Sequence, residues 1–321
     1  MLILLTGGRG FIGNKLLFRL CKSGYKVRLV TRTPVDYKLE GLELVQADLT
    51  SIDTDFDSLL FGCSLVFNCA GEVRNEKLMH PLHVDATERL VAAANRLACQ
   101  EHPIHFVQLS SVGAYGPSGG KVRVVTERTP TNPQGTYEET KTIADSLIMK
   151  DRNNDFYSYT ILRPSNVFGR TMTNTSLRQL GRIVGRRLFF YIGTARKDAV
   201  ATYVHVDDVV SALMLCGFKS GARNEIFNLS NDCALSELIS GMADALQVTR
   251  PKWSIPEVPL RFLVSMMNRF FNLPITQTRI DALVARTTYS SAKLHEVLEF
   301  VPEKKVPTAI GELFLAEPAV K

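Results

Sequence analysis

Short apolar runs alternate with longer amphipathic segments through the first half of the chain. The apolar runs predict buried strands over 2–5, 26–31, 42–46, 65–69, 104–109 and 157–162. Segments with apolar positions three or four residues apart fill the gaps and predict helices, most clearly over 81–99 and 137–150. Strands separated by single helices require parallel crossover connections. The pattern therefore predicts an α/β fold built on a doubly wound parallel sheet.

A glycine-rich turn follows the first predicted strand and opens the first helix. Gly7 permits a tight reversal, Gly10 lets the backbone approach a pyrophosphate, and Gly13 lets the helix lie close to the sheet. Phosphate groups would sit at the helix N-terminus, where unpaired N–H groups favour negative charge. Spaced glycines alone are a weak signal, but their place between a strand and a helix favours dinucleotide binding over an ordinary turn. The predicted contacts in this turn are Gly7, Arg9, Gly10, Phe11, Ile12 and Gly13.

The regular alternation weakens after residue 168. Helices are expected over 175–187 and 206–218 and a strand over 225–229, followed by helical segments interrupted by prolines. We predict a Rossmann dinucleotide-binding domain over 1–168 that also takes in roughly 199–230. A smaller, mainly helical substrate-binding domain would then comprise 169–198 and 231–321.

Composition limits the partners and the compartment. The 38 basic and 32 acidic residues among 321 give a net charge of +6 without a long basic block, which favours a phosphate-bearing small molecule over nucleic acid. No apolar run reaches the roughly 18 residues of a membrane-spanning helix. The first predicted strand begins near residue 2, which leaves no room for a secretory signal peptide before it. We therefore expect a cytoplasmic protein. The six cysteines lack metal-binding spacing and indicate buried, reduced side chains without a metal site.

The end of the second strand indicates which dinucleotide is bound. An acidic residue there would bind the ribose hydroxyls of NAD, but this chain has Arg32. Together with Arg9, it favours the 2′-phosphate of NADP over NAD, unless Arg32 is only a solvated loop residue. Asp48 and Leu49 follow the third strand and are candidates for the adenine edge. Ala70 follows the fourth strand and would pass beneath the cofactor.

Candidate catalytic residues follow the fifth strand. Tyr137 and Lys141 lie one turn apart on a predicted helix and share a face. A phenol has a pKa of about 10, and an adjacent ammonium group together with a cationic nicotinamide would favour its phenolate form. Lys141 would supply that field and hold the nicotinamide ribose, while Ser111 would hydrogen-bond the substrate oxygen. A tyrosine and a lysine at this spacing also occur as surface pairs, but the serine and the glycine turn in this chain order favour catalysis.

The chain resembles the extended short-chain dehydrogenase/reductase superfamily over essentially its whole length. The resemblance rests on T-G-G-R-G-F-I-G at 6–13, A-D-L at 47–49, L-S-S-V-G-A-Y-G at 109–116, Y-E-E-T-K at 137–141, R-P-S-N-V-F-G at 163–169 and Y-V-H-V-D-D-V-V at 203–210. It implies that Ser111 is catalytic and that Pro164 lies on the nicotinamide side. It further implies that Asn166 contacts the substrate, commonly a nucleotide sugar. It also implies a homodimer whose interface is formed by the helices 81–99 and 137–150. His205 is interpreted as a packing residue.

Departures from the family pattern narrow the reaction. Related dehydratases carry an Asp-Glu pair where this chain has Val112 and Gly113, which argues against dehydration. An arginine that clamps a diphosphate in related epimerases is replaced by Ala201. Another arginine would have to bind the diphosphate in its place. In a separate departure, a family asparagine is replaced by His83. The candidates for the diphosphate are Arg178 and Arg196, with Arg182 and Arg286 as further possibilities, although all four could simply be solvated.

Several functions remain open at this point. The first is reduction of a ketone by NADPH, with a 4-keto-deoxy nucleotide sugar as the implied substrate. The second is 4-epimerisation of a nucleotide sugar with tightly bound NAD. A steroid- or flavonoid-type alcohol dehydrogenase is a third, and a non-catalytic NADP sensor a fourth. The amphipathic segment 258–271 could wall an apolar pocket. We expect it to pack on the substrate domain or a dimer partner rather than to lie on a membrane.

Overall fold

Seven parallel strands form the central sheet of the larger lobe. The computed structural model describes residues 1–117, 122–150, 154–267 and 276–315. The spatial order of the strands is β12-β7-β5-β4-β1-β2-β3, with the chain reversing its direction of travel beside β1. The strands are β1 (Leu2–Thr6), β2 (Lys26–Thr31), β3 (Leu42–Gln46), β4 (Cys63–Asn68), β5 (Ile104–Leu109), β7 (Tyr157–Pro164) and β12 (Glu225–Leu229).

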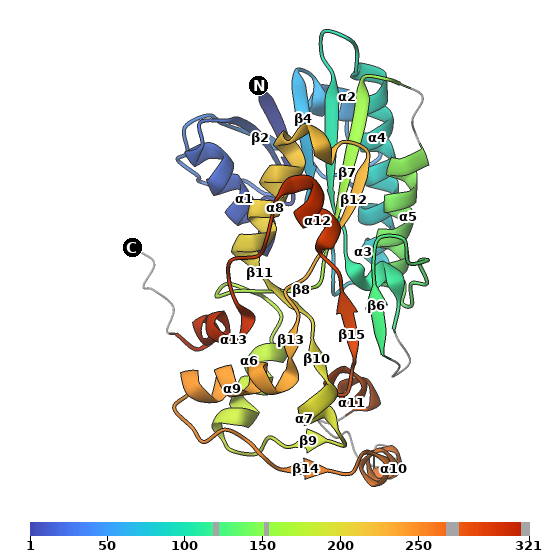
Figure 1. Ribbon diagram of the computed structural model, residues 1–321. Helices are drawn as coiled ribbons and strands as arrows, with labels where there is room; N and C mark the ends of the chain where they lie inside the picture. Colours follow the sequence, from blue (N-terminus) through green and yellow to red (C-terminus); the bar gives the residue numbers. More distant parts are fainter. Residues whose placement is uncertain (118–121, 151–153, 268–275, 316–321) are drawn as a thin grey trace.

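Helices cover both faces of this sheet (Figure 1). One face carries α1 (Phe11–Lys22), α8 (Val206–Phe218) and α12 (Ala292–Leu298). The other carries α2 (Phe56–Leu60), α4 (Ala86–Leu97) and α5 (Thr136–Lys150). Because both faces are covered, the central strand β1 is apolar on both sides: Ile3, Leu4 and Leu5 are all fully buried. The predicted doubly wound α/β class is confirmed.

A smaller lobe lies beyond the carboxyl ends of the strands and has its own apolar core (Figure 1). Its helices are α6 (Ser176–Gly185), α7 (Ala195–Asp198), α9 (Leu235–Ala245), α10 (Glu257–Met267), α11 (Gln277–Leu283) and α13 (Val306–Ala309), followed by a 3₁₀ turn at Ile310–Phe314. The boundaries proposed from the sequence stay predictions.

Four pairs of very short strands lie outside the central sheet, where they connect the two lobes and join segments within the smaller lobe. The parallel pairs are β6 (Arg123–Val125) with β15 (Thr287–Tyr289), β8 (Asn166–Phe168) with β11 (Tyr203–His205), and β9 (Tyr191–Ile192) with β14 (Ser254–Ile255); β10 (Val200–Ala201) and β13 (Cys233–Ala234) are antiparallel. Apart from β12, the sequence analysis assigned no strand after β7, because two or three residues carry no measurable periodicity.

Several predicted features can be compared directly with the structure. The bounds of β2, β3, β5, β12 and α8 match the predicted ranges. The helix expected over 81–99 instead begins with a π-helical turn at Pro81–Asp85, preceded by α3 (Glu76–His80). Residues 268–271 of the amphipathic segment lie outside the described part of the chain. His205 is buried and caps α8 by accepting the Asp207 backbone N–H at 3.2 Å, as a packing residue would.

Two further expectations concern the burial of the cysteines and the lack of a membrane-spanning helix. All six cysteines are free thiols, but only Cys63 and Cys216 are fully buried, so the expectation of burial was too broad. In the described part of the chain, no helix has both the length and the apolar character needed to cross a membrane.

Candidate active site

The glycine turn between β1 and α1 is locked by backbone packing. Gly7 has φ +68°, and a Cβ there would lie 2.5 Å from the carbonyl carbon of Cys69. A Cβ on Gly13 would lie 2.3 Å from the carbonyl oxygen of Gly7. The turn closes through a 2.9 Å hydrogen bond from the Gly10 N–H to that same oxygen. Only glycine fits the first and third positions, because the turn, α1 and the end of β4 are in direct backbone contact.

A cleft of about 660 Å³ lies at the ends of β1, β2, β3 and β4. The geometry fits a dinucleotide, because a narrow glycine-lined wall faces polar loops at the carboxyl ends of parallel strands. Among its lining residues are seven of the predicted cofactor contacts: Gly7, Arg9, Gly10, Arg32, Asp48, Leu49 and Ala70. Phe11, Ile12 and Gly13 form the first turn of α1 beside it.

Two arginines lie where the second strand enters this cleft. Arg9 and Arg32 both line it, and the Arg9 guanidinium donates a hydrogen bond to the Thr33 hydroxyl. Asp48, on the next loop, accepts the Thr50 N–H at 2.9 Å. This hydrogen bond, with a second from the Thr50 hydroxyl and the nearby charge of Arg32, lowers the pKa of Asp48. The cleft thus combines two cations with a carboxylate that is anionic at neutral pH.

Lys141 anchors α5 to the ends of two strands. Its Nζ is buried and donates to the Leu109 carbonyl at 2.9 Å and to the Ala70 carbonyl at 3.5 Å. Ala70 lines the dinucleotide cleft, so the ammonium group lies directly behind the wall of that cleft. Burial lowers the pKa of Lys141, although the nearby carboxylate of Asp145 acts in the opposite direction. Lys141 therefore lies next to the cleft in which we expect the cofactor, and its role there stays a prediction.

Ser111 stands at the end of β5 and begins a 3₁₀ turn at Val112–Tyr115. Its Oγ accepts the Gly113 N–H at 3.1 Å. A Cβ on Gly113 would lie 2.7 Å from Cγ of Glu138, so the serine turn packs closely on the first turn of α5. The fold thus brings the loop of Ser111 against the helix that carries Tyr137.

The ionisation of Tyr137 differs from the sequence-based expectation. The side chain is partly buried, and burial, followed by the charges of Glu138 and Asp145, raises its pKa to about 12. Desolvation and these two carboxylates determine the shift, so the predicted lowering of the pKa by Lys141 is not seen among the protein's own groups. Tyr137 is therefore a neutral phenol at neutral pH, which is the proton-donating form.

His83 is a site residue that the sequence analysis noted only as a replacement. It lies in the π-helical turn, and its ring meets the Tyr137 ring edge-on with centroids 5.6 Å apart. Its Nε2 accepts the Glu72 N–H at 2.8 Å, and its Nδ1 lies 2.8 Å from the Thr140 hydroxyl. Burial and Lys141 lower its pKa to about 3, so the imidazole is neutral. His83 thus joins the loop after β4 to α5.

A buried polar network supports α5 from below. Asp145, one turn after Lys141, accepts hydrogen bonds from the Ser110 hydroxyl at 2.8 Å and from Arg163 Nε at 2.9 Å. Arg163 also donates to the Tyr115 hydroxyl at 3.1 Å, which in turn donates to Asn228 at 2.8 Å. The only sequence signal for this network was the helical spacing of Asp145. The network fixes the rotation of α5 against β5 and β7.

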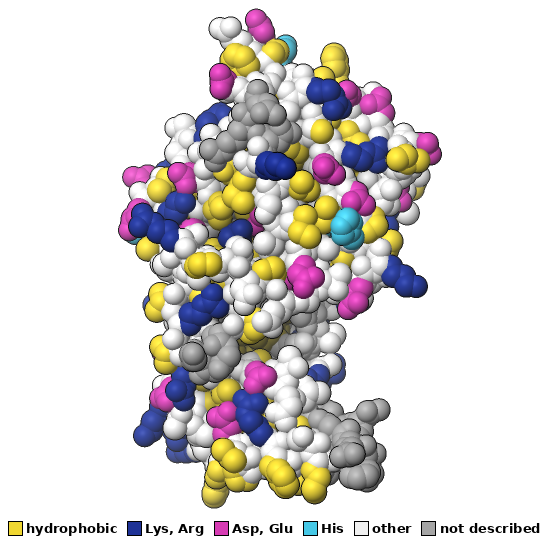
Figure 2. Space-filling view, turned by 90° about the vertical axis from the view of Figure 1, so that its right-hand side faces the viewer, with side chains coloured by type: hydrophobic (Ala, Val, Ile, Leu, Met, Phe, Trp, Pro, Cys, Tyr) yellow, Lys and Arg dark blue, Asp and Glu magenta, His cyan; other side chains and the backbone are white. Residues whose placement is uncertain are grey.

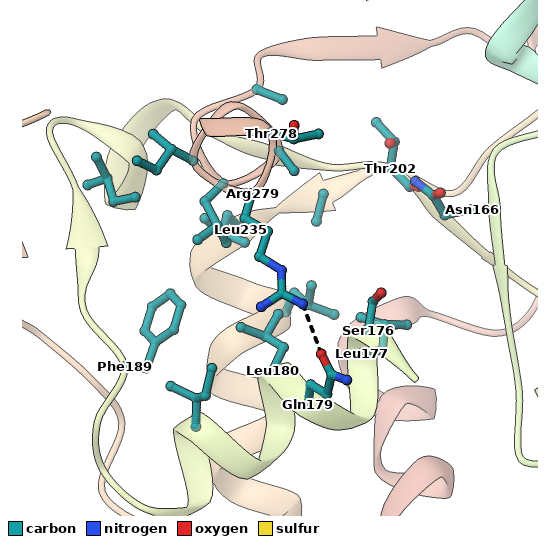
Figure 3. Close-up of a pocket in the computed structure, with 18 of the residues that line it drawn as sticks. Asn166, Ser176, Leu177, Gln179, Leu180, Phe189, Thr202, Leu235, Thr278 and Arg279 are labelled. Carbon is teal, nitrogen blue, oxygen red and sulfur yellow. Dashed lines mark hydrogen bonds between the residues drawn. The ribbon is translucent and has the colours of Figure 1, made fainter. Parts of the chain in front are cut away.

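A second cavity, of about 520 Å³, opens in the smaller lobe (Figure 3). Asn166 lies at one end beside Thr202, whose carbonyl accepts its side-chain amide at 3.0 Å. Arg279 from α11 reaches into the cavity and donates to Gln179 at 3.1 Å. Most of the remaining wall is apolar, including Leu177, Leu180, Phe189, Leu235, Leu238 and Leu283.

The arginines predicted as diphosphate ligands lie elsewhere. Arg178 donates to the backbone carbonyls of Arg170 and Met172, which ties α6 to the preceding loop. Arg196 is exposed and contacts the Lys252 carbonyl at 3.5 Å. Neither lines the cavity. The arginine that does, Arg279, was missed because its short helix follows a proline-interrupted stretch without a motif.

Comparison with known proteins identifies the family to which the chain belongs. The sequence model of the NAD dependent epimerase/dehydratase family matches residues 3–230. The chain belongs to this family. UDP-glucose 4-epimerase of Vibrio cholerae is 26% identical over 267 residues, covering 80% of this chain and 79% of that protein. Short-chain dehydrogenase/reductase family 42E member 1 of Danio rerio is 28% identical over 336 residues, covering 94% and 84%.

Other relatives widen the range of reactions within this family. Tetraketide alpha-pyrone reductase 1 of Arabidopsis thaliana is 26% identical over 275 residues, covering 74% of this chain and 79% of that protein. The solved UDP-glucuronic acid 4-epimerase of Bacillus cereus, in complex with NAD, has a TM-score of 0.73 at 17% identity, covering 98% and 96%, and confirms the fold. The chain is thus an NAD(P)-dependent enzyme of the short-chain dehydrogenase/reductase superfamily.

Proposed function

We propose that this epimerase/dehydratase-family enzyme uses NADP(H) to reduce a ketone, with the 4-keto group of a nucleotide-activated deoxysugar as the first candidate substrate. The observation that carries the proposal is the position of α5, which bears Tyr137 and Lys141. The Lys141 ammonium donates to the carbonyl of Ala70, a residue that lines the glycine-lined cleft, and the turn that follows Ser111 packs on the first turn of the same helix. The cleft would hold the dinucleotide and the cavity the body of the substrate.

The chain's own residues account for the proton chemistry. When bound, the reduced dinucleotide supplies the hydride that adds to the carbonyl carbon. The Ser111 hydroxyl donates a hydrogen bond to the ketone oxygen, which orients it and polarises the C–O bond. Tyr137, held as a phenol by its raised pKa, gives its proton to that oxygen. The Lys141 ammonium then stabilises the resulting phenolate until a proton from water restores the phenol.

The preference for NADP rests on Arg9 and Arg32. Both line the cleft at the end of β2, where an acidic residue would otherwise bind the ribose hydroxyls. Two guanidinium groups suit a 2′-phosphate because each can donate paired hydrogen bonds. NAD held tightly for epimerisation is the competing possibility, and the epimerase relatives favour it. Titration with NADPH and NADH separates the two, since Arg32→Glu should weaken NADPH binding and leave NADH binding nearly unchanged.

The nucleotide-sugar proposal is supported by Arg279 and Asn166, which face the same cavity (Figure 3). Arg279 could take a diphosphate in place of Gln179, while aromatic and aliphatic walls would enclose the base. A second candidate, an apolar ketone or alcohol, is favoured by the predominance of leucine and phenylalanine in the wall. Relatives named sterol-4-alpha-carboxylate 3-dehydrogenase and tetraketide alpha-pyrone reductase are also compatible with it.

Arg279→Gln tests the choice of substrate. For a nucleotide sugar we expect KM to rise about tenfold with kcat little changed, because a charge-assisted contact to the diphosphate is lost. For an apolar ketone the same variant should leave KM unchanged. Arg182→Gln is the matched control, since Arg182 is exposed on α6 and does not line the cavity. Activity with apolar ketones alone would overturn the nucleotide-sugar proposal.

The expected homodimer remains a proposal. The two helical segments predicted to form it, now α4 and α5, pack side by side on one face of the sheet (Figure 1). Light scattering tests it directly: a monomeric mass would overturn it.

A further inference from the structure

Helix α10 carries its apolar side chains on the outside. Of its described residues only Leu260 and Val264, one turn apart, are buried against the smaller lobe. Val258, Phe262, Leu263 and Met266 are 79%, 71%, 47% and 51% exposed. The expected packing of this segment on the substrate domain is therefore achieved by a narrow stripe only. The broader apolar face points to solvent.

Two neighbouring loops extend this apolar face. β9 and β14 are paired in parallel, and the Tyr191 N–H donates to the Trp253 carbonyl at 2.8 Å. The loops that lead into these strands run along the same end of the molecule (Figure 1). They carry Leu188 and Trp253, which are 65% and 82% exposed. We call Leu188, Trp253, Val258, Phe262, Leu263 and Met266 the apolar end.

The apolar end is a cluster at the tip of the molecule. Figure 2 shows hydrophobic side chains gathered along the bottom of the smaller lobe. On the larger lobe, large exposed apolar residues such as Ile52 and Phe61 belong to separate loops. Single exposed apolar residues are normal on a protein surface, but contiguous ones mark an interaction site.

Cations lie next to Leu188 and Trp253 at the apolar end. Arg186, Arg187 and Lys252 are exposed on the two loops, and the described residues include no carboxylate within ion-pair distance of any of them. The nearest acidic groups on α10 and α11, Glu257 and Asp281, are both paired with Arg261 at 2.8 Å. The excess charge around the apolar residues is positive, which complements an anionic surface.

The cavity of the smaller lobe reaches this surface. Leu188 lines the cavity and is also exposed at the apolar end. Leu260 lines the cavity from the buried side of α10. Whatever covers the apolar end therefore also touches the wall of the cavity.

We propose that the apolar end rests on an anionic lipid surface, with α10 lying in the plane of the interface. An outward apolar face, a tryptophan at its edge and an adjacent set of cations are the features of helices that bind membranes without crossing them. Burial of the apolar residues removes them from water, and the arginines and the lysine contact lipid phosphates. This proposal does not depend on which ketone the enzyme reduces.

Trp253 reports the contact directly, because it is the chain's one tryptophan. We expect its emission to shift to shorter wavelength, and the protein to co-sediment, with vesicles of phosphatidylglycerol and phosphatidylcholine. Vesicles of phosphatidylcholine alone should bind much less, and added salt should release the protein. Val258→Ser combined with Phe262→Ser should weaken vesicle binding at least about tenfold.

Phe61→Ser is the matched control, since Phe61 is 73% exposed on the larger lobe. It should leave vesicle binding unchanged, and all variants should retain NADPH affinity as evidence of folding. An unshifted Trp253 spectrum with both vesicle types would overturn the proposal. It would also be overturned if the α10 variant changed the mass by light scattering from dimer to monomer while the wild type ignored vesicles, because a second copy would then be the occupant.

Discussion

The two lobes hold their functional groups by different means. In the larger lobe, backbone contacts dominate: Gly7 and Gly13 touch neighbouring backbone, and Lys141 is hydrogen-bonded to strand-end carbonyls. In the smaller lobe, the cavity is enclosed by side chains from short helices and two-residue strands. Backbone geometry tolerates few residue types, whereas an apolar wall tolerates many. We therefore expect the larger lobe to determine the reaction and the smaller lobe the substrate.

Replacing Tyr137 should have the largest effect. Tyr137→Phe removes the proton donor and should lower kcat by about 10²–10⁴-fold while NADPH affinity stays within about twofold. Tyr203→Phe is the counterpart in the cavity wall and should alter KM more than kcat. Steady-state kinetics and dinucleotide titration measure both. If Tyr137→Phe kept more than about a tenth of the activity, the assignment of the acid would be wrong.

The backbone constraint is tested next by two glycines with similar dihedral angles. Gly7 and Gly62 have φ +68° and +75°, but a Cβ on Gly62 meets nothing within 4 Å. Both alanine variants should lose about 1 kcal/mol of stability, because alanine is strained in a left-handed backbone conformation. Only Gly7→Ala should also weaken NADPH binding, by at least about tenfold, because its Cβ would force the glycine turn away from the backbone of Cys69 and Ala70, just after β4. Equal effects of the two variants would show that the close approach at Gly7 is unimportant.

A smaller effect is expected at His83. His83→Leu leaves the partly buried Glu72 N–H without its acceptor and removes the ring contact with Tyr137, so kcat should fall about tenfold without a rise in KM. His83→Asn keeps an oxygen that can accept this N–H and should recover much of the loss. A change confined to KM would place His83 with the substrate contacts and weaken the division between the lobes.

The last prediction concerns the pH dependence of stability rather than an effect on activity or binding. Burial lowers the pKa of His105 to about 4 and that of His83 to about 3, below the ordinary value of 6.5. The unfolded chain therefore takes up protons first as the pH falls. Stability present above about pH 6.5 should decline by roughly 1.4 kcal/mol per unit and per histidine down to about pH 4. Thermal denaturation at several pH values checks this, and His105→Gln should have a shallower decline.

The same contrast explains what could be predicted from the sequence. The glycine turn, the strands of the sheet and the Tyr137–Lys141 pair were visible, because each depends on local spacing. The arginine of the cavity was not: Arg178 and Arg196 were predicted, and Arg279 lines it. Its position depends on how α11 packs on the smaller lobe, which has no periodic signature. His83 and the Asp145–Arg163 pair likewise arise from contacts between distant segments.

Transfer of isotope from the dinucleotide tests the central claim most directly. The enzyme would be supplied with NADPH deuterated at the hydride-donating carbon and a 4-keto-deoxy nucleotide sugar. The account predicts one deuterium on the new carbinol carbon of each product and one NADP⁺ formed per turnover, both lost in Tyr137→Phe. Conversion of a nucleotide sugar to its 4-epimer without net oxidation of added dinucleotide would contradict it and identify an epimerase.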